Sequence, residues 1–553
     1  MTIKVTSDLW WKNAVIYCLD VETFYDSDGD GYGDFAGLIE RLDYLAGIGV
    51  TCVWLMPFYP TPSRDDGYDV ADFYGVDPRL GTLGDFTEFV RTAQDRGLRV
   101  IADLVVNHTS AEHPWFQAAR ADRGSPYRDF YVWVDERPPG PAEVVFPGEQ
   151  DDSWTFDEQA GQWYLHRFYR HQPDLNVTNP AVRDEIAKVI GFWIQQGLSG
   201  FRVDAVPFLI ETAHADPKEL PDPHEYLRDL RAFLGRRKGD ATLLGEVNLP
   251  PKDSSAYFGD GGDELHMLFN FPAMQALYLS LAREDARPLR EALERLPPAP
   301  EDSQWANFVR NHDELTLDKR SEAERQEIFA AFGPDESMQL YGRGLRRRLP
   351  SMLGGDQRRI RLVYSLLFSL PGTPVLFYGE EIGMAENLDV EGRMSVRTPM
   401  QWSNEPNAGF STAPAELLRR PVVEGDFGPA RVNVADQRGD PNSLLNWMER
   451  LIRRRKECPE FGLGACQLVD TGNPGVFAHR CDWNGRVLLA LHNLSSKPAS
   501  ITLAIDQPQD CDGLVDLLGD PGLAPLDGGS FRVDLAGFDY RWYRVHRAGD
   551  RYR

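Results

Sequence analysis

The chain alternates between short apolar runs and longer amphipathic segments. The runs are rich in β-branched and aromatic residues, as buried strands are, whereas the apolar residues of the longer segments recur at helical spacing. We expect eight strands, at residues 14–21, 51–56, 99–107, 200–206, 242–247, 267–271, 305–311 and 373–378. Strands that alternate with helices indicate a parallel sheet, and eight such units predict an α/β fold, a closed (β/α)8 TIM barrel.

Two connections between the predicted strands are far longer than a barrel needs. Residues 108–179, after the third strand, are rich in Trp, Tyr, Pro and Asp, and residues 314–356, after the seventh, are strongly charged. Long connections with a composition of their own are usually functional insertions. We therefore predict a barrel domain A at 1–107 and 180–457, an inserted domain B at 108–179, and a lid at about 314–356.

The pattern changes after a last amphipathic helix at residues 443–456. From there the apolar runs are short and are separated by Gly, Asn, Asp and Pro, at residues 467–470, 476–480, 487–494, 499–505, 529–535 and 540–545. Short strands divided by turn residues are typical of all-β domains. Residues 458–553 are therefore predicted to form a C-terminal β-sandwich, domain C.

The composition narrows the possible partners and compartment. The 553 residues carry a formal net charge of −26, which disfavours nucleic acid and anionic membranes as partners. The six cysteines show no CxxC spacing, the N-terminus lacks the pattern of a signal peptide, and the longest apolar run is too short to span a bilayer. We expect a soluble cytoplasmic protein, as a monomer or a homo-oligomer, with no nucleic-acid or membrane partner.

Three acidic residues stand at the carboxyl ends of different predicted strands. Asp204 ends the fourth strand, Glu246 the fifth and Asp313 the seventh. Active sites of TIM barrels lie at these strand ends, so the three carboxylates should meet at one mouth. A single carboxylate at a strand end is more often a helix cap or an ion-pair partner, but the joint pattern favours a catalytic site.

These residue types suit the chemistry of a retaining glycosidase. Arg202 lies two residues before Asp204 and faces the same way, so its guanidinium should lower the pKa of Asp204 and keep this nucleophile ionised. Partial desolvation should raise the pKa of Glu246, as an acid that protonates a leaving oxygen requires. Adjacent strands lie about 4.7–4.9 Å apart, which suits the carboxyl separation of about 5–5.5 Å in such enzymes. Asp313 would grip substrate hydroxyls.

One acidic loop is a candidate metal site. Residues 26–34 match the first nine positions of an EF-hand loop, with side-chain ligands from Asp26, Asp28, Asp30 and Asp34 and a carbonyl ligand from Tyr32. The twelfth position is Gly37 instead of Glu, so a single-loop site for Ca²⁺, or alternatively Mg²⁺, is predicted; a solvated acidic turn is the other interpretation. We see no zinc or iron cluster and expect no organic cofactor.

Several of these segments together resemble glycoside hydrolase family 13, the α-amylase clan. Its four signature regions correspond, in the same order, to 103–108, 200–204, Glu246 and 311–313. Residues 172–176 and 397–402 resemble its oligo-1,6-glucosidase and trehalose synthase branch. The segments most similar to trehalose synthases are 65–72, 256–260, 310–317 and 407–410. The resemblance covers nearly the whole chain.

The resemblance implies a role for each matching residue. Asp204 would be the nucleophile, Glu246 the general acid/base and Asp313 the transition-state stabiliser. The pocket for the covalently bound sugar would be lined by Asp65, Tyr68, His108, Arg202, His312 and Arg397. A second Ca²⁺ site is also implied, with the side chains of Asn107, Asp174 and Glu211 and the carbonyls of Phe208 and Leu209 as ligands.

The chain departs from that branch at three places. The first strand reads Tyr17-Cys-Leu-Asp20-Val-Glu22 where Tyr-Glu-Leu-His-Val-Arg is common, residues 245–248 read Gly-Glu-Val-Asn for Ala-Glu-Ala-Asn, and residues 392–395 read Gly-Arg-Met-Ser for acidic-Arg-Asn-Gly. The three carboxylates are untouched by these changes. The departures leave the acceptor of the sugar open.

The leading hypothesis is a trehalose synthase-like enzyme. It would transfer a glucosyl unit to Asp204 and return it to the released glucose, so that maltose and trehalose interconvert. Its substrates would be small α-linked glucosides: maltose, trehalose, and as further candidates sucrose or short oligosaccharides. The alternatives are an α-glucosidase or transglucosidase with the same first step, and a catalytically silent sugar-binding scaffold, against which the complete triad argues.

Overall fold

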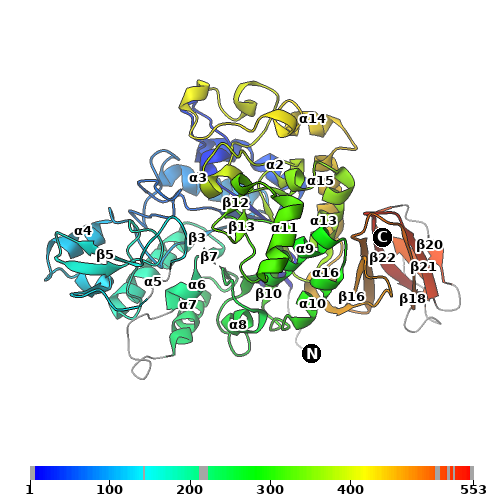
Figure 1. Cartoon of the computed structure of the whole chain (residues 1–553), viewed down its shortest axis with the longest axis horizontal. Helices are drawn as coiled ribbons and strands as arrows, with labels where there is room; N and C mark the ends of the chain where they lie inside the picture. The colour runs from blue at the N-terminus through cyan, green and yellow to red at the C-terminus, as the bar shows by residue number, and fades with distance from the viewer. Residues whose placement is uncertain are drawn as a thin grey trace.

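The barrel predicted from the sequence is present and closed. The computed structural model describes residues 6–140, 144–210, 222–504, 511–519, 523–526 and 530–547. Eight parallel strands follow one another around the barrel in the order β1-β14-β10-β9-β8-β7-β3-β2 (Figure 1). They are β1 (Ile16–Leu19), β2 (Cys52–Leu55), β3 (Arg99–Leu104), β7 (Gly200–Val203), β8 (Thr242–Gly245), β9 (Met267–Phe269), β10 (Gln304–Phe308) and β14 (Thr373–Phe377).

The strands are shorter than the sequence predicts, mainly at their carboxyl ends. β3 ends at Leu104 and β10 at Phe308, whereas strands to residues 107 and 311 were expected. The difference consists of one or two buried valines after each strand, Val105, Val106 and Val309, and of the polar residues Asn107, Arg310 and Asn311 that follow them and are no longer part of the ladder. The apolar residues pack inside, so that each described strand is buried almost throughout.

The helices begin where side chains cap them and bury one face against the barrel. Thr82 and Asp85 form a capping box at the start of α3, and Asn179 caps α5, whose first residue is Pro180. The outer helices are α1 (Phe35–Glu40), α2 (Leu42–Ile48), α3 (Leu83–Asp95), α5 (Pro180–Gln195), α7 (Pro223–Arg237), α9 (Phe271–Arg283), α10 (Arg287–Arg295), α13 (Gln357–Ser369) and α15 (Leu444–Lys456).

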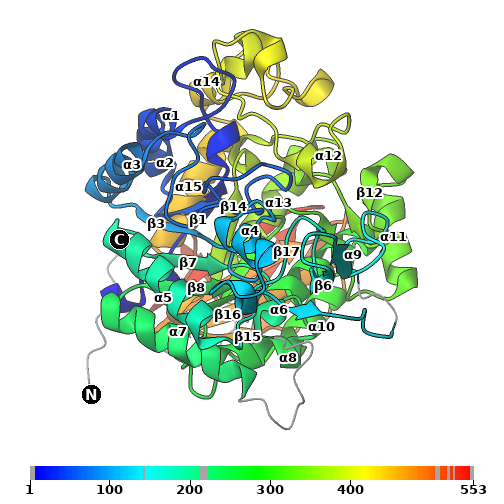
Figure 2. The same ribbon diagram turned by 90° about the vertical axis from the view of Figure 1, so that its left-hand side faces the viewer.

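The long connection after β3 forms a small body of its own beside the barrel. It contains α4 (Pro114–Ala121) and a sheet of β4 (Trp133–Val134), β6 (Gln162–Leu165) and β5 (Trp154–Asp157). Its core is aromatic: Phe116 stacks on Trp133 and meets Tyr131 and Tyr164 edge-on. Figures 1 and 2 show this segment, in blue and cyan, on the side of the barrel opposite the C-terminal sheets.

The connection after β10 also carries its own elements. They are β11 (Leu315–Thr316), α11 (Glu322–Phe332), β12 (Gln339–Leu340), β13 (Gly344–Leu345) and α12 (Leu349–Met352), and the three strands form one antiparallel sheet. A further long segment follows β14, from Gly379 to α14 (Val434–Gly439). It consists mainly of turns and short 3₁₀ helices such as η7 (Gly392–Val396). These have no regular hydrophobic period, so this insertion was not predicted.

The C-terminal part is all-β, with a six-stranded and a two-stranded antiparallel sheet. Its strands are β15 (Ala465–Leu468), β16 (Val476–Trp483), β17 (Arg486–Asn493), β18 (Ala499–Ala504), β19 (Cys511–Asp516), β20 (Leu523–Pro525), β21 (Ser530–Leu535) and β22 (Tyr540–Arg547). β19 and β20 were not predicted. Among the described residues, none of the helices combines the length and the apolarity that a membrane span needs.

Candidate active site

A pocket of about 1130 Å³, counted with its open mouth, lies at the carboxyl ends of the barrel strands. It brings the three predicted catalytic carboxylates together, although β7, β8 and β10 are far apart in the sequence. Its wall contains Asp65, Tyr68, His108, Phe146, Phe168, Asp204, Phe208, Glu246, Asn248, Asn311, Asp313, Glu314, Asp318, Lys319, Arg343 and Arg393.

One guanidinium joins two of the three carboxylates. Arg202, which is 1% exposed, donates from Nη1 to Asp204 Oδ1 and from Nη2 to Glu246 Oε2, the latter at 2.7 Å. Glu246 Oε2 also accepts from the backbone N–H of Ala205 at 3.1 Å. Because one planar group reaches both acids, Asp204 and Glu246 are held on the same side of the barrel mouth, as attack and protonation at a single bond require.

Burial dominates the acidity of this pair. It raises the pKa of Glu246 to about 7, although Arg202 opposes the shift. It also raises the pKa of Asp204 to about 6, against the lowering effect of the same guanidinium. The expectation that Arg202 would keep the pKa of Asp204 low was therefore wrong in its net result, because desolvation outweighs the single ion pair. The order of the two acids still suits their roles: Asp204 ionises before Glu246.

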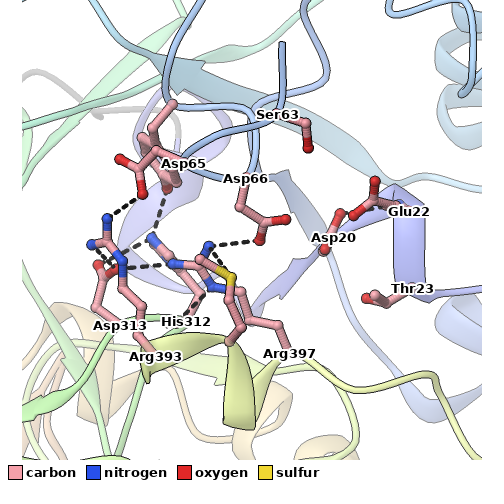
Figure 3. A network of polar contacts seen from close by, with 12 residues as sticks. Asp20, Glu22, Thr23, Ser63, Asp65, Asp66, His312, Asp313, Arg393 and Arg397 are labelled. Carbon is pink, nitrogen blue, oxygen red and sulfur yellow. Dashed lines mark hydrogen bonds and ion pairs between the residues drawn. The ribbon is translucent and has the colours of Figure 1, made fainter. Parts of the chain in front are cut away.

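The pKa of Asp313 is shifted in the opposite direction, below its ordinary value. Burial raises its pKa, but His312, Arg393 and Arg397 together bring it well below its ordinary value. Arg393 donates to Asp313 Oδ1 at 2.8 Å and Arg397 at 3.1 Å, and His312 Nε2 lies 3.1 Å from Asp313 Oδ2 (Figure 3). Asp313 thus lines the pocket as a fixed negative charge.

The predicted sugar-binding residues fall into two layers. Asp65, Tyr68 and His108 line the pocket, whereas Arg202, His312 and Arg397 lie directly behind its wall and are almost completely buried. Tyr68 connects the layers, because its hydroxyl lies 2.6 Å from His312 Nε2 and its ring stacks on the imidazole. Burial lowers the pKa of His312 to about 4, so this imidazole is neutral.

Several pocket residues were not found from the sequence. Arg393 bridges Asp313 and Asp65, with its Nη2 2.6 Å from Asp65 Oδ1. Across the pocket, Asp318 accepts from Asn248 at 3.0 Å and pairs with Lys319, and Arg343 pairs with Glu314. Asn248 and Arg393 lie in the two departing segments, residues 245–248 and 392–395. The sequence alone did not indicate that their side chains line the pocket.

The acidic loop after β1 brings some of its predicted ligands together. One carboxylate oxygen each from Asp26, Asp28 and Asp34 lies within 4.8 Å of the others, a donor set that suits a hard cation. Asp30 is not part of this group and accepts from the N–H of Tyr32 at 2.8 Å. Asp26 also accepts from the N–H groups of Gly29 and Gly31, so the loop is closed by its own hydrogen bonds.

The residues predicted for the second metal fit it only in part. Asp174 Oδ2 is buried and has no hydrogen-bond donor among the described residues, as a carboxylate awaiting a cation would. The carbonyl of Phe208, however, accepts from Arg167 Nη1 at 2.5 Å, and this guanidinium lies 3.8 Å from Asp174 Oδ2. Asn107 lies beside His108, Leu209 follows Phe208 in α6 (Val206–Ile210), and Glu211 is outside the described residues.

Three carboxylates meet at the mouth of a closed barrel, and two of them are bonded to the same guanidinium. This arrangement defines an enzyme of the glycosidase type. The chain belongs to the α-amylase family: residues 18–331 and 345–463 match the family described as alpha amylase, catalytic domain. Residues 485–544 match the sucrose hydrolase-like C-terminal domain.

Similar proteins agree with this assignment. The chain is 42% identical over 551 residues to the trehalose synthase/amylase TreS of Mycobacterium tuberculosis, covering 98% of this chain and 91% of that protein. It is 44% identical over 534 residues to a trehalose synthase of Thermus thermophilus, covering 95% of this chain and 54% of that protein. Among solved structures, the trehalulose synthase MutB of Pseudomonas mesoacidophila matches with a TM-score of 0.77 at 27% identity, over 97% of this chain and 99% of that one.

Proposed function

We propose that this enzyme interconverts maltose and trehalose by moving one α-glucosyl unit through Asp204. The observation that carries the proposal is the polar lining of the pocket outside the triad. The side chains of Asn248, Glu314 and Asp318 offer hydrogen-bond donors and acceptors in the same cavity as the triad. A second glucose can therefore be held while the first is bound covalently. The trehalose synthases among the relatives support the same conclusion.

In the first step, a carboxylate oxygen of Asp204 attacks the anomeric carbon of the bound glucosyl unit. Glu246 gives its proton to the glycosidic oxygen, so the bond between that oxygen and the anomeric carbon breaks and glucose is released. Arg202 stays bonded to both acids, and the negative charge of Asp313 stabilises the positive charge that develops on the ring.

The second step reverses the first with a different hydroxyl. Glu246, now a carboxylate, takes the proton of the anomeric hydroxyl of the released glucose as that oxygen attacks the glucosyl carbon. The ester bond to Asp204 breaks and its oxygen recovers the negative charge. Two displacements retain the α configuration of the transferred unit. If the glucose turns so that its 4-hydroxyl attacks, maltose is formed again.

Isomerisation requires water to stay out while the covalent intermediate exists. We propose that the lid predicted at 314–356 supplies this barrier together with the segment after β3. Tyr341 of the lid packs against Phe146 at a ring-centroid distance of 5.3 Å and is hydrogen-bonded to Tyr169. Glu314, Lys319 and Arg343 of the lid also line the pocket.

An α-glucosidase or transglucosidase is the second candidate, favoured by the pocket's opening to solvent. Product analysis distinguishes the two. The enzyme should be incubated separately with maltose, trehalose and sucrose, and the products and the anomer released first should be resolved. We expect trehalose from maltose with retained configuration; glucose alone would favour the glucosidase. Asp204→Asn should abolish turnover, and full activity of that variant would mean that the measured turnover does not pass through Asp204; a wild-type protein that turns over none of the three sugars would favour the non-catalytic scaffold.

We propose Ca²⁺, with Mg²⁺ as the alternative, in the loop of Asp26, Asp28 and Asp34. Such an ion would hold the loop after β1 in shape and take no part in the reaction. The ion at Asp174 stays a prediction, because Arg167 has to turn away from Phe208 before that site can form.

Chelation is expected to lower the melting temperature of the wild-type protein, because an ion that binds only the folded chain stabilises it. Asp28→Ala removes an exposed ligand and should melt at the same temperature with and without chelator. A wild-type melting temperature that does not respond to thorough chelation would count against the site.

We also propose a cytoplasmic location. Cys18 of β1 and Cys52 of the neighbouring β2 are completely buried. Their thiols form no disulfide, as is usual in a reducing compartment. Small glucosides are the proposed partners.

A further inference from the structure

A chain of buried ion pairs leads from Asp313 back to the first strand. Arg397 is completely buried and uses all of its guanidinium: Nη2 donates to Asp313 Oδ1, Nη1 to Asp66 Oδ2 at 2.6 Å, and Nε to the carbonyl of His312 at 2.9 Å. Figure 3 shows Asp66 between Arg397 and the two acids Asp20 and Glu22. The orientation of Arg397 toward Asp313 therefore depends on where Asp66 stands.

The other oxygen of Asp66 is held by Arg420, from the irregular segment after β14. Arg420 is 5% exposed and donates from Nη2 to Asp66 Oδ1. It also donates to the carbonyl of Arg397 at 2.8 Å, to Glu22 Oε2 at 3.2 Å and to Asp20 Oδ2 at 3.4 Å. A single guanidinium thus contacts the side chain of Asp66 and the backbone of Arg397 at the same time.

The position of Asp66 requires such support. Its backbone has φ 54, a left-handed conformation that residues other than glycine seldom adopt and that persists only when the surroundings hold it. One oxygen each of Asp66, Asp20 and Glu22 lies within 4.8 Å of the others. Three buried acids so close together repel one another unless a cation lies between them, and burial already raises the pKa of Glu22 to about 7.

Asp20 follows β1 directly, Glu22 lies in the short helix η2 (Val21–Thr23), and both side chains are buried. Arg420, from the segment after β14, supplies a positive charge next to these two acids. The contacts with Asp66 and with the backbone of Arg397 show that its place is more specific than charge balance requires.

We infer that Arg420 is a positioning residue for glucoside cleavage: it holds Asp66 in its left-handed conformation and thereby aims Arg397 at Asp313. The inference rests on the proposed function, because it gives Asp313 a role in the transition state. Lysine cannot replace Arg420, since its single ammonium nitrogen cannot reach Asp66, Glu22 and the Arg397 carbonyl in the geometry of a planar fork.

The first test is Arg420→Lys, assayed for release of 4-nitrophenol from 4-nitrophenyl α-glucoside, together with the melting temperature. We expect kcat to fall by about 10-fold or more, as small misplacements near a transition state do, while KM changes by less than about 3-fold. Because the positive charge is kept, the melting temperature should stay within a few degrees. Arg419→Lys is the matched control. Arg419 lies 3.7 Å from Glu22, is 37% exposed and, among the described residues, forms no hydrogen bond or ion pair with Asp66, so kcat should be unchanged.

A second comparison separates positioning from charge balance. Arg420→Met alone leaves the acids unpaired, and Asp20→Asn with Glu22→Gln in the same chain removes their charge. If Arg420 positions Asp66, the triple variant should regain the melting temperature lost by Arg420→Met but keep the low kcat. Recovery of kcat in the triple variant, or wild-type kcat in Arg420→Lys, would overturn the positioning role.

The assay with 4-nitrophenyl α-glucoside distinguishes failure of the proposed function from failure of the inference about Arg420. Release of 4-nitrophenol belongs to the first half-reaction, and glucose added to the assay beside water completes each turnover, so the rate can be measured whichever acceptor the enzyme prefers. Wild-type protein that releases no 4-nitrophenol would overturn the proposed function and with it the inference. Active wild-type protein with an equally active Arg420→Lys variant would overturn the inference alone.

Discussion

Asp204 and Glu246 are bonded to the same guanidinium, yet the reaction needs them in different protonation states. Asp204 must be ionised to attack, and Glu246 must be protonated to release the leaving group. Burial raises the pKa of Asp204 to about 6 and that of Glu246 to about 7. Arg202 moderates both shifts but cannot cancel them. The interval between the two pKa values therefore defines the pH range in which the pair is in its working state.

Glu246→Gln tests this assignment. In the wild-type enzyme, kcat/KM should rise with pH as Asp204 ionises near 6 and fall as Glu246 loses its proton near 7. The glutamine has no proton to lose, so with an aryl glucoside that needs no protonation the fall above pH 7 should disappear while the rise near 6 remains. With an alkyl glucoside, activity should drop by about 10²–10⁴-fold. A variant that keeps the alkaline limb would assign that limb to another group.

Glu380, a buried acid outside the pocket, should make the free energy of unfolding depend on pH. Glu380 is 2% exposed, and burial raises its pKa from 4.5 to about 8, although the N–H of Phe377 donates to it. The folded protein keeps a proton that the unfolded chain loses above about 4.5. Folding therefore binds a proton between pH 4.5 and 8, and the free energy of unfolding falls as pH rises through that interval.

Glu380→Gln removes this dependence. The melting temperature of the variant, relative to wild type, should increase between pH 5 and pH 8.5 by several degrees, because only the wild-type chain has to keep a proton that the solvent no longer favours. Calorimetric scans at the two pH values measure the difference. Glu416→Gln, at an exposed residue, is the control and should give the same difference at both. A constant difference for Glu380→Gln as well would mean that this carboxyl is ionised in the folded protein.

The triad could be predicted because each member follows a strand that its own apolar neighbours define. Asp204, Glu246 and Asp313 needed only the strand ends and the geometry of a barrel to be placed together. Arg393 and Arg420 could not be placed in this way. They lie in a segment without periodicity, and their contacts with Asp65 and Asp66 join residues more than 300 positions apart. Only the folded chain brings such residues together.

At the scale of elements, the two insertions of the barrel meet above the pocket. Phe146, from the connection after β3, stacks on Tyr169 at 4.8 Å and receives Tyr341 of the lid at 5.3 Å. Arg393 lies over the same Phe146 ring at 5.0 Å. An aromatic contact between two separately formed segments can open without unfolding either of them, so it is the natural place to control the entry of water.

Tyr341→Ala should therefore change the product more than the rate. Without the ring, the lid loses its contact with Phe146 and its hydrogen bond to Tyr169, and water competes better for the covalent intermediate. From maltose we expect the ratio of glucose to trehalose to rise by about 2–5-fold, while total maltose consumption stays within about 2-fold. Tyr341→Phe keeps the ring contact and should lie between wild type and the alanine variant. An unchanged product ratio would place the barrier elsewhere.

The elements differ in how far the sequence predicted them. All eight barrel strands were predicted, because buried apolar runs between helices leave a clear signal. Their carboxyl ends were extended too far, since Val105, Val106 and Val309 continue the β-branched pattern of β3 and β10. The strands β19 and β20 were missed because Asp, Gly and Pro interrupt their apolar residues, so that neither contains a continuous run.

At the scale of the whole molecule, the barrel and the C-terminal sheets share one apolar core. Trp542 of β22 is completely buried and meets Phe461 edge-on at 5.0 Å, and the carbonyl of Phe461 accepts from Gly372 of the barrel domain. Arg455 of α15 is also buried and donates to the carbonyls of Phe368 and Gly372. A second, smaller core lies between the two C-terminal sheets and includes Leu514. The molecule is thus built from two cores, one of which crosses the domain boundary.

This arrangement predicts different consequences for two large-to-small substitutions. Trp542→Ala removes a side chain that joins the barrel to the sheets, so it should lower the stability of both by about 3–5 kcal/mol and shift the loss of activity on heating together with the calorimetric transition. Leu514→Ala leaves a cavity in the second core alone, at a cost of about 2–5 kcal/mol. It should produce an early transition that leaves glucoside cleavage intact, because the barrel keeps its own core. The two variants are compared by calorimetry and by the residual activity of the same heated samples. If Leu514→Ala also inactivated the barrel at its first transition, the two cores would have to unfold as one unit, and the C-terminal sheets would be part of the barrel's stability throughout.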